Sequence, residues 1–88
     1  MQVFMVQRSL KGIPMDDLAA AQQRAISKAN EMTSAGTPVR YLRTTFAPES
    51  GLCMCVFAAG DAEAVKKLNE EANIPFDKVH AAMDLMAP

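Results

Sequence analysis

Apolar and polar residues divide the chain into six segments, and the first of them, residues 2–8, is predicted to be a strand. This segment contains the run Val3-Phe4-Met5-Val6, which alternates only loosely. A short apolar run of this kind is typical of a strand that is covered on both faces. We therefore expect the chain to begin with a buried strand.

Two longer segments have the spacing of amphipathic helices. Between residues 15 and 32 the apolar side chains fall on one stripe. Pro14 suits the first helical position, and Asp16 places negative charge where the helix dipole favours it. In the second segment Asp61 is a suitable N-cap, and Asn73 ends the helical pattern. The sequence predicts a helix in each segment.

The remaining three segments are predicted to be strands. Residues 39–46 and 52–57 flank the turn signal of residues 47–51, so together they indicate a β-hairpin. Residues 78–86 alternate apolar and polar side chains with the period of a half-buried strand. The order βαββαβ is that of the ferredoxin-like α+β fold, in which a four-stranded antiparallel sheet has two helices on one face. We expect one such domain over residues 1–88.

The hairpin offers a way to assign side chains to the two faces of the sheet, because directly paired residues share a face. Pairing Phe46 with Leu52 keeps the apolar side chains together and sets Tyr41 opposite Phe57 on the other face. A shift by one residue would mix the two sets. On this register the predicted helix-facing core consists of Leu42, Phe46, Leu52, Met54, Val56, Val79, Ala81, Met83 and Leu85. The predicted open face consists of Phe4, Val6, Arg8, Tyr41, Arg43, Thr45, Cys53, Cys55, Phe57, His80 and Asp84.

The predicted open face is too apolar for a sheet surface in water. A second copy of the chain is the most economical cover, so we expect a homodimer of the dimeric α/β barrel type. Polar groups enclosed between two sheets need partners from each other, from water or from a ligand. We expect this cavity to bind a small molecule. The candidate ligand-binding residues are Arg8, Tyr41, Arg43, Cys55, His80 and Asp84.

Charge and hydropathy argue against two classes of partner. Lys and Arg total 9 against 10 for Asp and Glu, so the formal charge is −1 and no net positive field attracts nucleic acid. The longest apolar stretches are far shorter than the roughly 20 residues of a membrane-spanning helix. The first residues lack the basic region of a signal peptide. We expect a cytoplasmic protein that binds neither nucleic acid nor membrane.

Few residues could hold a metal ion. The chain has one histidine and a Cys-x-Cys pair, whereas transition-metal sites use several imidazole, thiolate or carboxylate ligands. Cys53 and Cys55 are expected to be free thiols packed as small hydrophobic groups, because a disulfide between them would be strained. No cofactor is predicted from the residues alone. The alternative is a metal site formed by His80 with one of the two cysteines.

A small cofactor-free enzyme, such as an isomerase or a monooxygenase, would use the same residues. His80 could act as general acid or base, Tyr41 as a hydrogen-bond donor, Arg43 as a clamp for a carboxylate, and Cys55 as a nucleophile. The alternative is that Arg43 pairs with Asp84 or Glu49 and that Tyr41 simply packs. Recognised catalytic motifs are absent from the sequence, so no residue is assigned a catalytic role. A structural or protein-interaction role is the third class that fits the sequence.

Several motifs spread over nearly the whole chain resemble one family. They include Tyr41-Leu42-Arg43-Thr44-Thr45-Phe46, Cys53-Met54-Cys55-Val56-Phe57 and Asn73-Ile74-Pro75-Phe76-Asp77. These motifs are similar to those of small bacterial proteins of unknown function, one of which is described as a nickel-binding protein. The resemblance implies a dimeric ferredoxin-like barrel, and nickel is the one cofactor that it suggests.

Overall fold

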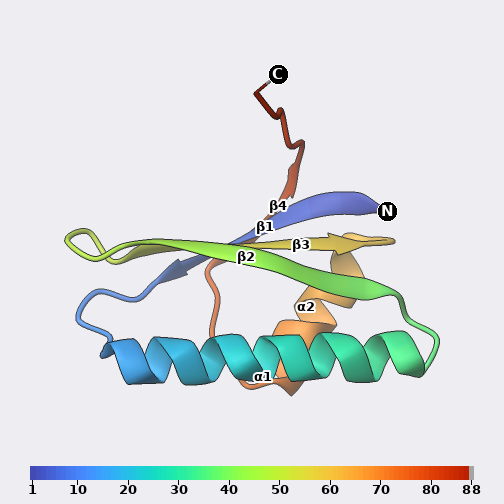
Figure 1. Ribbon diagram of the computed structural model, residues 1–88, viewed down its shortest axis with the longest axis horizontal. Helices are drawn as coiled ribbons and strands as arrows, with labels where there is room; N and C mark the ends of the chain where they lie inside the picture. Colours follow the sequence, from blue (N-terminus) through green and yellow to red (C-terminus); the bar gives the residue numbers. More distant parts are fainter. Residues whose placement is uncertain (88) are drawn as a thin grey trace.

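The computed structural model describes residues 1–87 and contains a four-stranded antiparallel sheet with two helices. The elements are β1 (Gln2–Ser9), α1 (Met15–Ser34), β2 (Val39–Ala47), β3 (Leu52–Ala59), α2 (Ala62–Glu71) and β4 (Lys78–Ala82). The strands lie in the order β2-β3-β1-β4, and both helices cover the same face of the sheet (Figure 1). The predicted ferredoxin-like α+β fold is confirmed.

Local sequence signals account for the ends of both helices. The backbone N–H of Ala64 donates to Oδ1 of Asp61 at 2.9 Å, so the predicted N-cap is formed. Asn73 has a positive φ of 57° just after α2, a conformation that asparagine tolerates better than most residues. In α1, Asp16 lies in the first turn and Gly36 adopts a φ of 100° after the last turn. Each helix therefore begins and ends where its sequence indicates.

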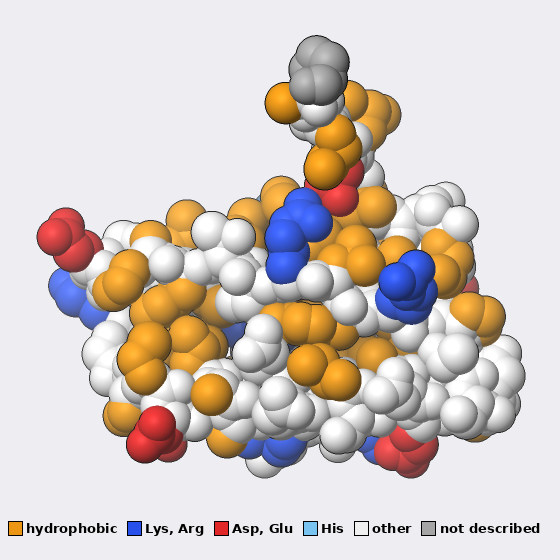
Figure 2. All heavy atoms as spheres, in the orientation of Figure 1, with side chains coloured by type: hydrophobic (Ala, Val, Ile, Leu, Met, Phe, Trp, Pro, Cys, Tyr) orange, Lys and Arg blue, Asp and Glu red, His pale blue; other side chains and the backbone are white. Residues whose placement is uncertain are grey.

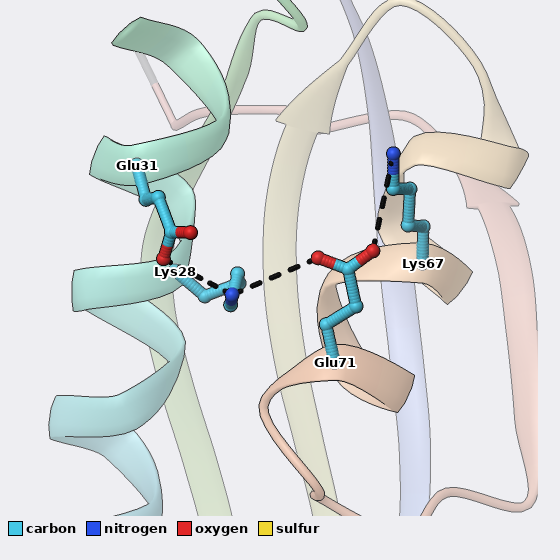
Figure 3. A network of polar contacts seen from close by, with 4 residues as sticks. All are labelled: Lys28, Glu31, Lys67 and Glu71. Atoms are coloured by element: carbon cyan, nitrogen blue, oxygen red, sulfur yellow. Dashed lines mark ion pairs between the residues drawn. The ribbon is translucent and has the colours of Figure 1, made fainter. Parts of the chain in front are cut away.

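An ion-pair network joins the exposed sides of the two helices (Figure 3). Nζ of Lys28 in α1 lies 3.0 Å from Oε2 of Glu31 and 3.6 Å from Oε1 of Glu71 in α2. Nζ of Lys67 lies 3.9 Å from the other carboxylate oxygen of Glu71. The hydrogen bond with Glu31 raises the pKa of Lys28 above its ordinary value. The carboxylates of Glu31 and Glu71 are exposed, so water screens these pairs and they contribute little to stability.

β4 is shorter than predicted, because it ends at Ala82 and does not continue to residue 86. It pairs with β1 at the edge of the sheet, and the last pair joins Ala82 to Val3, next to the first residue of β1. Beyond that point no strand among residues 1–87 pairs with this segment. Residues 83–87 run away from the sheet on the side opposite the helices (Figure 1), where Met83, Leu85 and Met86 are each about four-fifths exposed.

The faces of the sheet are largely the reverse of the sequence prediction. Phe4 of β1 lies opposite Phe57 of β3, and Val6 lies opposite Cys55. All four are buried beneath the helices, whereas the sequence analysis placed them on the open face. The observed core consists of Phe4, Val6, Val39, Cys53, Cys55, Phe57 and Ala59 of the sheet, with Ala25, Ala29, Met32, Val65 and Leu68 of the helices.

The predicted core is therefore only partly correct. Three residues of the predicted core lie on the helix side, because they pair with buried residues of β1 or β3. They are Phe46, Val79 and Ala81. Three others alternate with buried residues of β3 and so face the open side, namely Leu52, Met54 and Val56. Met83 and Leu85 lie beyond β4. Leu42 belongs to an irregularity in β2.

A β-bulge at Leu42 causes the error in the hairpin register. Tyr41 pairs with Phe57 as predicted, but the next pair joins Arg43 to Val56. β2 therefore contains one extra residue at this point relative to β3. The rest of the hairpin is shifted by one residue, and Phe46 lies opposite Cys53 instead of Leu52. The bulge turns side chains of both flanking stretches of β2 toward the helices.

The observed faces of the sheet predict that replacing leucine by alanine lowers the free energy of unfolding by different amounts at two positions. Leu68→Ala removes a side chain with no exposed surface, and we expect it to lower the free energy of unfolding by about 2–5 kcal/mol. Leu52→Ala alters a residue that is 44% exposed on the open side, and we expect a loss below about 1 kcal/mol. Denaturant unfolding of both variants provides the measurement. A cost for Leu52→Ala equal to that of Leu68→Ala would restore the original face assignment.

Candidate functional site

The sheet separates the six predicted site residues into two groups. Arg8, Tyr41 and Cys55 face the helices. The strand pairing places them on the same face as the buried residues of β1 and β3. Arg43 and His80 face the open side, and Asp84 follows β4 on that side. The active site sketched from the sequence, which needed His80 and Arg43 beside Tyr41 and Cys55, is therefore not formed. The helix-side group lines a cavity.

This cavity, called the α1 cavity below, lies between α1 and the helix-facing side of the sheet. Its volume is about 160 Å³. It is lined by Arg8, Leu10, Leu18, Ala21, Gln22, Ala25, Tyr41, Thr44, Phe46, Cys55 and Ile74. Most of these side chains are apolar, and small alanines of α1 face the larger side chains of β2. The cavity predicted from the sequence lies between the open faces of two copies of the chain, whereas the α1 cavity lies on the helix side of the sheet within one protomer.

One wall of the α1 cavity is a chain of polar side chains. Nε2 of Gln22 donates to the Tyr41 hydroxyl at 2.8 Å, and that hydroxyl is hydrogen-bonded to the Thr44 hydroxyl. The Thr44 hydroxyl in turn donates to Sγ of Cys55 at 3.1 Å. The Tyr41 ring packs edge to face on Phe57, with the ring centroids 5.5 Å apart. The bulge at Leu42 is what brings Tyr41 and Thr44 to the same face.

Arg8 forms another part of the wall and is only 2% exposed. Its Nη2 donates to Oδ1 of Asn69 at 2.6 Å, and its Nη1 donates to the carbonyl oxygen of Pro75 at 3.0 Å. Nδ2 of Asn69 donates to the carbonyl oxygen of Val65 at 2.8 Å, which fixes the orientation of the amide. Both acceptors of the guanidinium are neutral. Within residues 1–87, Arg8 takes part in no ion pair.

The two cysteines are free thiols, as predicted, and both are buried. Cys53 lies directly opposite Arg8 in the pairing of β1 with β3. Burial, followed by the neighbouring Cys55, raises the pKa of Cys53 from 9.0 to about 11, and Arg8 only partly offsets this rise. The thiol is therefore neutral at physiological pH. It does not supply a negative charge to balance Arg8.

The open-side group forms two separate contacts. Nη2 of Arg43 lies 3.0 Å from Oδ1 of Asp84, so the pairing considered as an alternative in the sequence analysis is formed. Nε2 of His80 lies 2.8 Å from Oε1 of Gln7. The thiols lie on the other face of the sheet, so His80 does not meet them. Among residues 1–87, no three His, Cys, Asp or Glu side chains are grouped as a metal ion would require.

Sequence reasoning missed three polar residues of the site, namely Gln22, Thr44 and Asn69. Asn69 had a detectable signal, because it lies beside Leu68 within the apolar stripe of α2 and is completely buried. A polar residue at a core position indicates a buried partner. Thr44 reaches the cavity only through the bulge, and Gln22 is one of two adjacent glutamines on a helix rich in alanine. Their spacing gave no comparable signal.

The fold and the cavity define a small ferredoxin-like protein with a pocket between its first helix and its sheet. The chain belongs to the SCO4226-like family, described as nickel responsive protein SCO4226-like, whose model matches residues 4–81. This match confirms the family resemblance found in the sequence. No curated protein matches the chain. No helix within residues 1–87 is both long enough and apolar enough to cross a membrane.

A solved structure is similar over nearly the full length of the chain. It is SCO4226 from Streptomyces coelicolor A3(2), a crystal structure that superposes with a TM-score of 0.78. The two sequences are 28% identical, and the similarity covers 97% of this chain and 99% of that chain. The likeness therefore extends across every strand and helix described above.

The raised pKa of Cys53 predicts a loss of stability at alkaline pH. Between about pH 9 and about pH 11 the thiol ionises in the unfolded chain but stays protonated in the folded one, so the free energy of unfolding falls as the pH rises. We expect urea unfolding to show a steeper decline across this window for the wild type than for Cys53→Ala. Equal declines would show that burial does not perturb this thiol.

Proposed function

We propose that this protein binds a small organic molecule and that the molecule occupies the α1 cavity of each protomer. The observation that carries the proposal is the cavity itself, an apolar space with a continuous polar wall from Gln22 to Cys55. Apolar cavities with a few convergent polar groups are the usual form of small-molecule sites. Its volume of about 160 Å³ is close to that of cavities that accept a benzene ring.

The lining residues define how a ligand would be held. Leu18 and Ala25 of α1 and Phe46 of β2 offer apolar contact. The hydroxyl protons of Tyr41 and Thr44 are used within the polar wall, so these oxygens can accept from a polar substituent of the ligand. The polar residues are linked to one another, so they are ordered before a ligand arrives. Such order reduces the entropic cost of binding.

We also propose that two copies of the chain associate through the open face of the sheet. The open side of β1 and β3 carries Met5, Met54 and Leu52, and both helices lie on the other face of the sheet (Figure 1). The exposed tail, residues 83–87, projects from this side, and its surface is mainly hydrophobic (Figure 2). A second copy would cover both. The two free thiols favour a reducing compartment, the cytoplasm.

The description of the family names nickel, but the ligands within one protomer do not fit a nickel site. The single imidazole, His80, is hydrogen-bonded to Gln7 on the open side, and Asp84 is paired with Arg43. Both thiols are buried on the helix side. A nickel ion bound by this chain would need open-side residues of two protomers together. We therefore place an organic ligand of the α1 cavity ahead of nickel.

A pair of matched substitutions in α1 tests the proposed site. Ala21 lines the cavity, whereas Ala19 is exposed on the same helix. Ala21→Leu should fill the cavity and abolish the binding of one-ring probes, and Ala19→Leu should leave it unchanged. Amide NMR spectra recorded with benzoate, benzamide and benzyl alcohol provide the measurement. If none of the three probes perturbs the wild type at millimolar concentration, the α1 cavity is not a binding site.

The dimer has its own test. Sedimentation of the wild type should give twice the mass of the 9.5 kDa chain. Met5→Glu places a charge on the open face and should yield monomers, because an unpaired charge is costly in an apolar interface. Met15→Glu, on an exposed residue of α1, should remain dimeric. A wild-type monomer at micromolar concentration would contradict the association.

A further inference from the structure

The guanidinium of Arg8 is a buried positive charge that forms no ion pair with any of residues 1–87. Its exposed fraction is 2%, and its recorded hydrogen bonds go to two neutral oxygens, Oδ1 of Asn69 and the carbonyl of Pro75. A buried charge is costly unless an opposite charge accompanies it. Proteins rarely bury Arg in this way without a partner. Arg8 therefore requires an explanation beyond packing.

Two acidic groups, Asp77 and Cys53, follow or face Arg8 in the fold, and neither forms an ion pair with it. Asp77, two residues after Pro75, accepts a hydrogen bond from the Ser9 hydroxyl at 2.6 Å and is exposed. The thiol of Cys53, opposite Arg8 in the sheet, remains protonated because burial raises its pKa. Within residues 1–87 the balancing charge is therefore not provided by the chain.

Arg8 also lines the α1 cavity, where it is the single charged residue among eleven. The rest of the lining combines apolar side chains with the polar wall from Gln22 to Cys55. An anion inside this cavity would meet the uncompensated charge in surroundings of low dielectric, where an ion pair is much stronger than in water. The apolar lining would at the same time accept a hydrocarbon group of one-ring size.

We propose that the α1 cavity is specific for a small organic carboxylate whose anionic group pairs with Arg8. This inference rests on the proposed function and adds the chemical class of the ligand. The carboxylate would lie at the Arg8 end, and the apolar body would pack against Leu18, Ala25 and Phe46. Arginine suits this role because its guanidinium stays charged and matches the geometry of a carboxylate.

Benzoate and benzamide form the decisive pair of probes, because they have nearly the same shape and differ in charge. Binding to the wild type at neutral pH is measured by calorimetry or by amide NMR. We expect benzoate to bind about tenfold more tightly than benzamide or better, as a charged hydrogen-bonded partner would. Equal affinities would overturn the carboxylate assignment but leave the proposed function intact. Failure of both probes and of benzyl alcohol would overturn the proposed function as well.

Asn69→Asp is the sharpest variant, since it changes one atom group and supplies Arg8 with a carboxylate from the protein itself. Oδ1 of residue 69 already lies 2.6 Å from Nη2 of Arg8. The variant should lose the preference for benzoate and retain benzamide binding, while it also removes the Nδ2 group that donates to the carbonyl oxygen of Val65. Arg8→Met should also lose the preference if it folds. A preference for benzoate that survives Asn69→Asp would contradict a role for the charge of Arg8.

Discussion

The pairing of β1 with β3 is the constraint on which the rest of the structure depends. The two central strands run side by side over eight residue pairs without a bulge, so side chains alternate strictly between the two faces. Because Phe4 and Val6 enter the core, Arg8 must point to the same side. The alternation of side chains along β1 therefore places the charge of Arg8 in the interior of the protein. Asn69 of α2 and the carbonyl of Pro75 then meet it there.

The α1 cavity follows from what faces this pair of strands. α1 presents Ala21 and Ala25 toward the sheet, and such short side chains leave room beneath the helix. The bulge at Leu42 supplies the polar wall, because it places Tyr41 and Thr44 on the same face of β2. An apolar space, an ordered hydroxyl pair and a buried guanidinium therefore converge at one place. Their combination is the physical basis for proposing a carboxylate ligand.

The sequence was sufficient to predict the order and type of every element, because capping residues, turn signals and periodicity all pointed to βαββαβ. It was insufficient to predict the faces of the sheet. The runs Val3-Phe4-Met5-Val6 and Leu52-Cys53-Met54-Cys55 are apolar on both faces, so alternation alone does not say which set meets the helices. The bulge at Leu42 has no mark in the sequence.

For the candidate site, too, the sequence indicated which residues to consider but not where the fold places them. Arg8, Tyr41 and Cys55 were selected correctly as residues that share one face, but the prediction placed them on the wrong side of the sheet. His80 and Asp84 were grouped with them because the inward faces of β1 and β3 were assigned to the open side, and Arg43 was added through the mistaken register of the hairpin. The last strand was extended too far because residues 83–86 continue its alternation, although β1 has already ended beside Ala82. Tertiary pairing, which the local pattern does not contain, decided each of these points.

The central claim is that the ligand site lies between α1 and the sheet and not on the open face. Intermolecular nuclear Overhauser effects in a complex with benzoate test this claim directly, because they identify the side chains within a few ångströms of the ring. The account predicts contacts from the ring protons to Leu18, Ala25 and Phe46. Contacts to Met5 and Met54 instead would place the ligand on the opposite face of the sheet and would contradict the account.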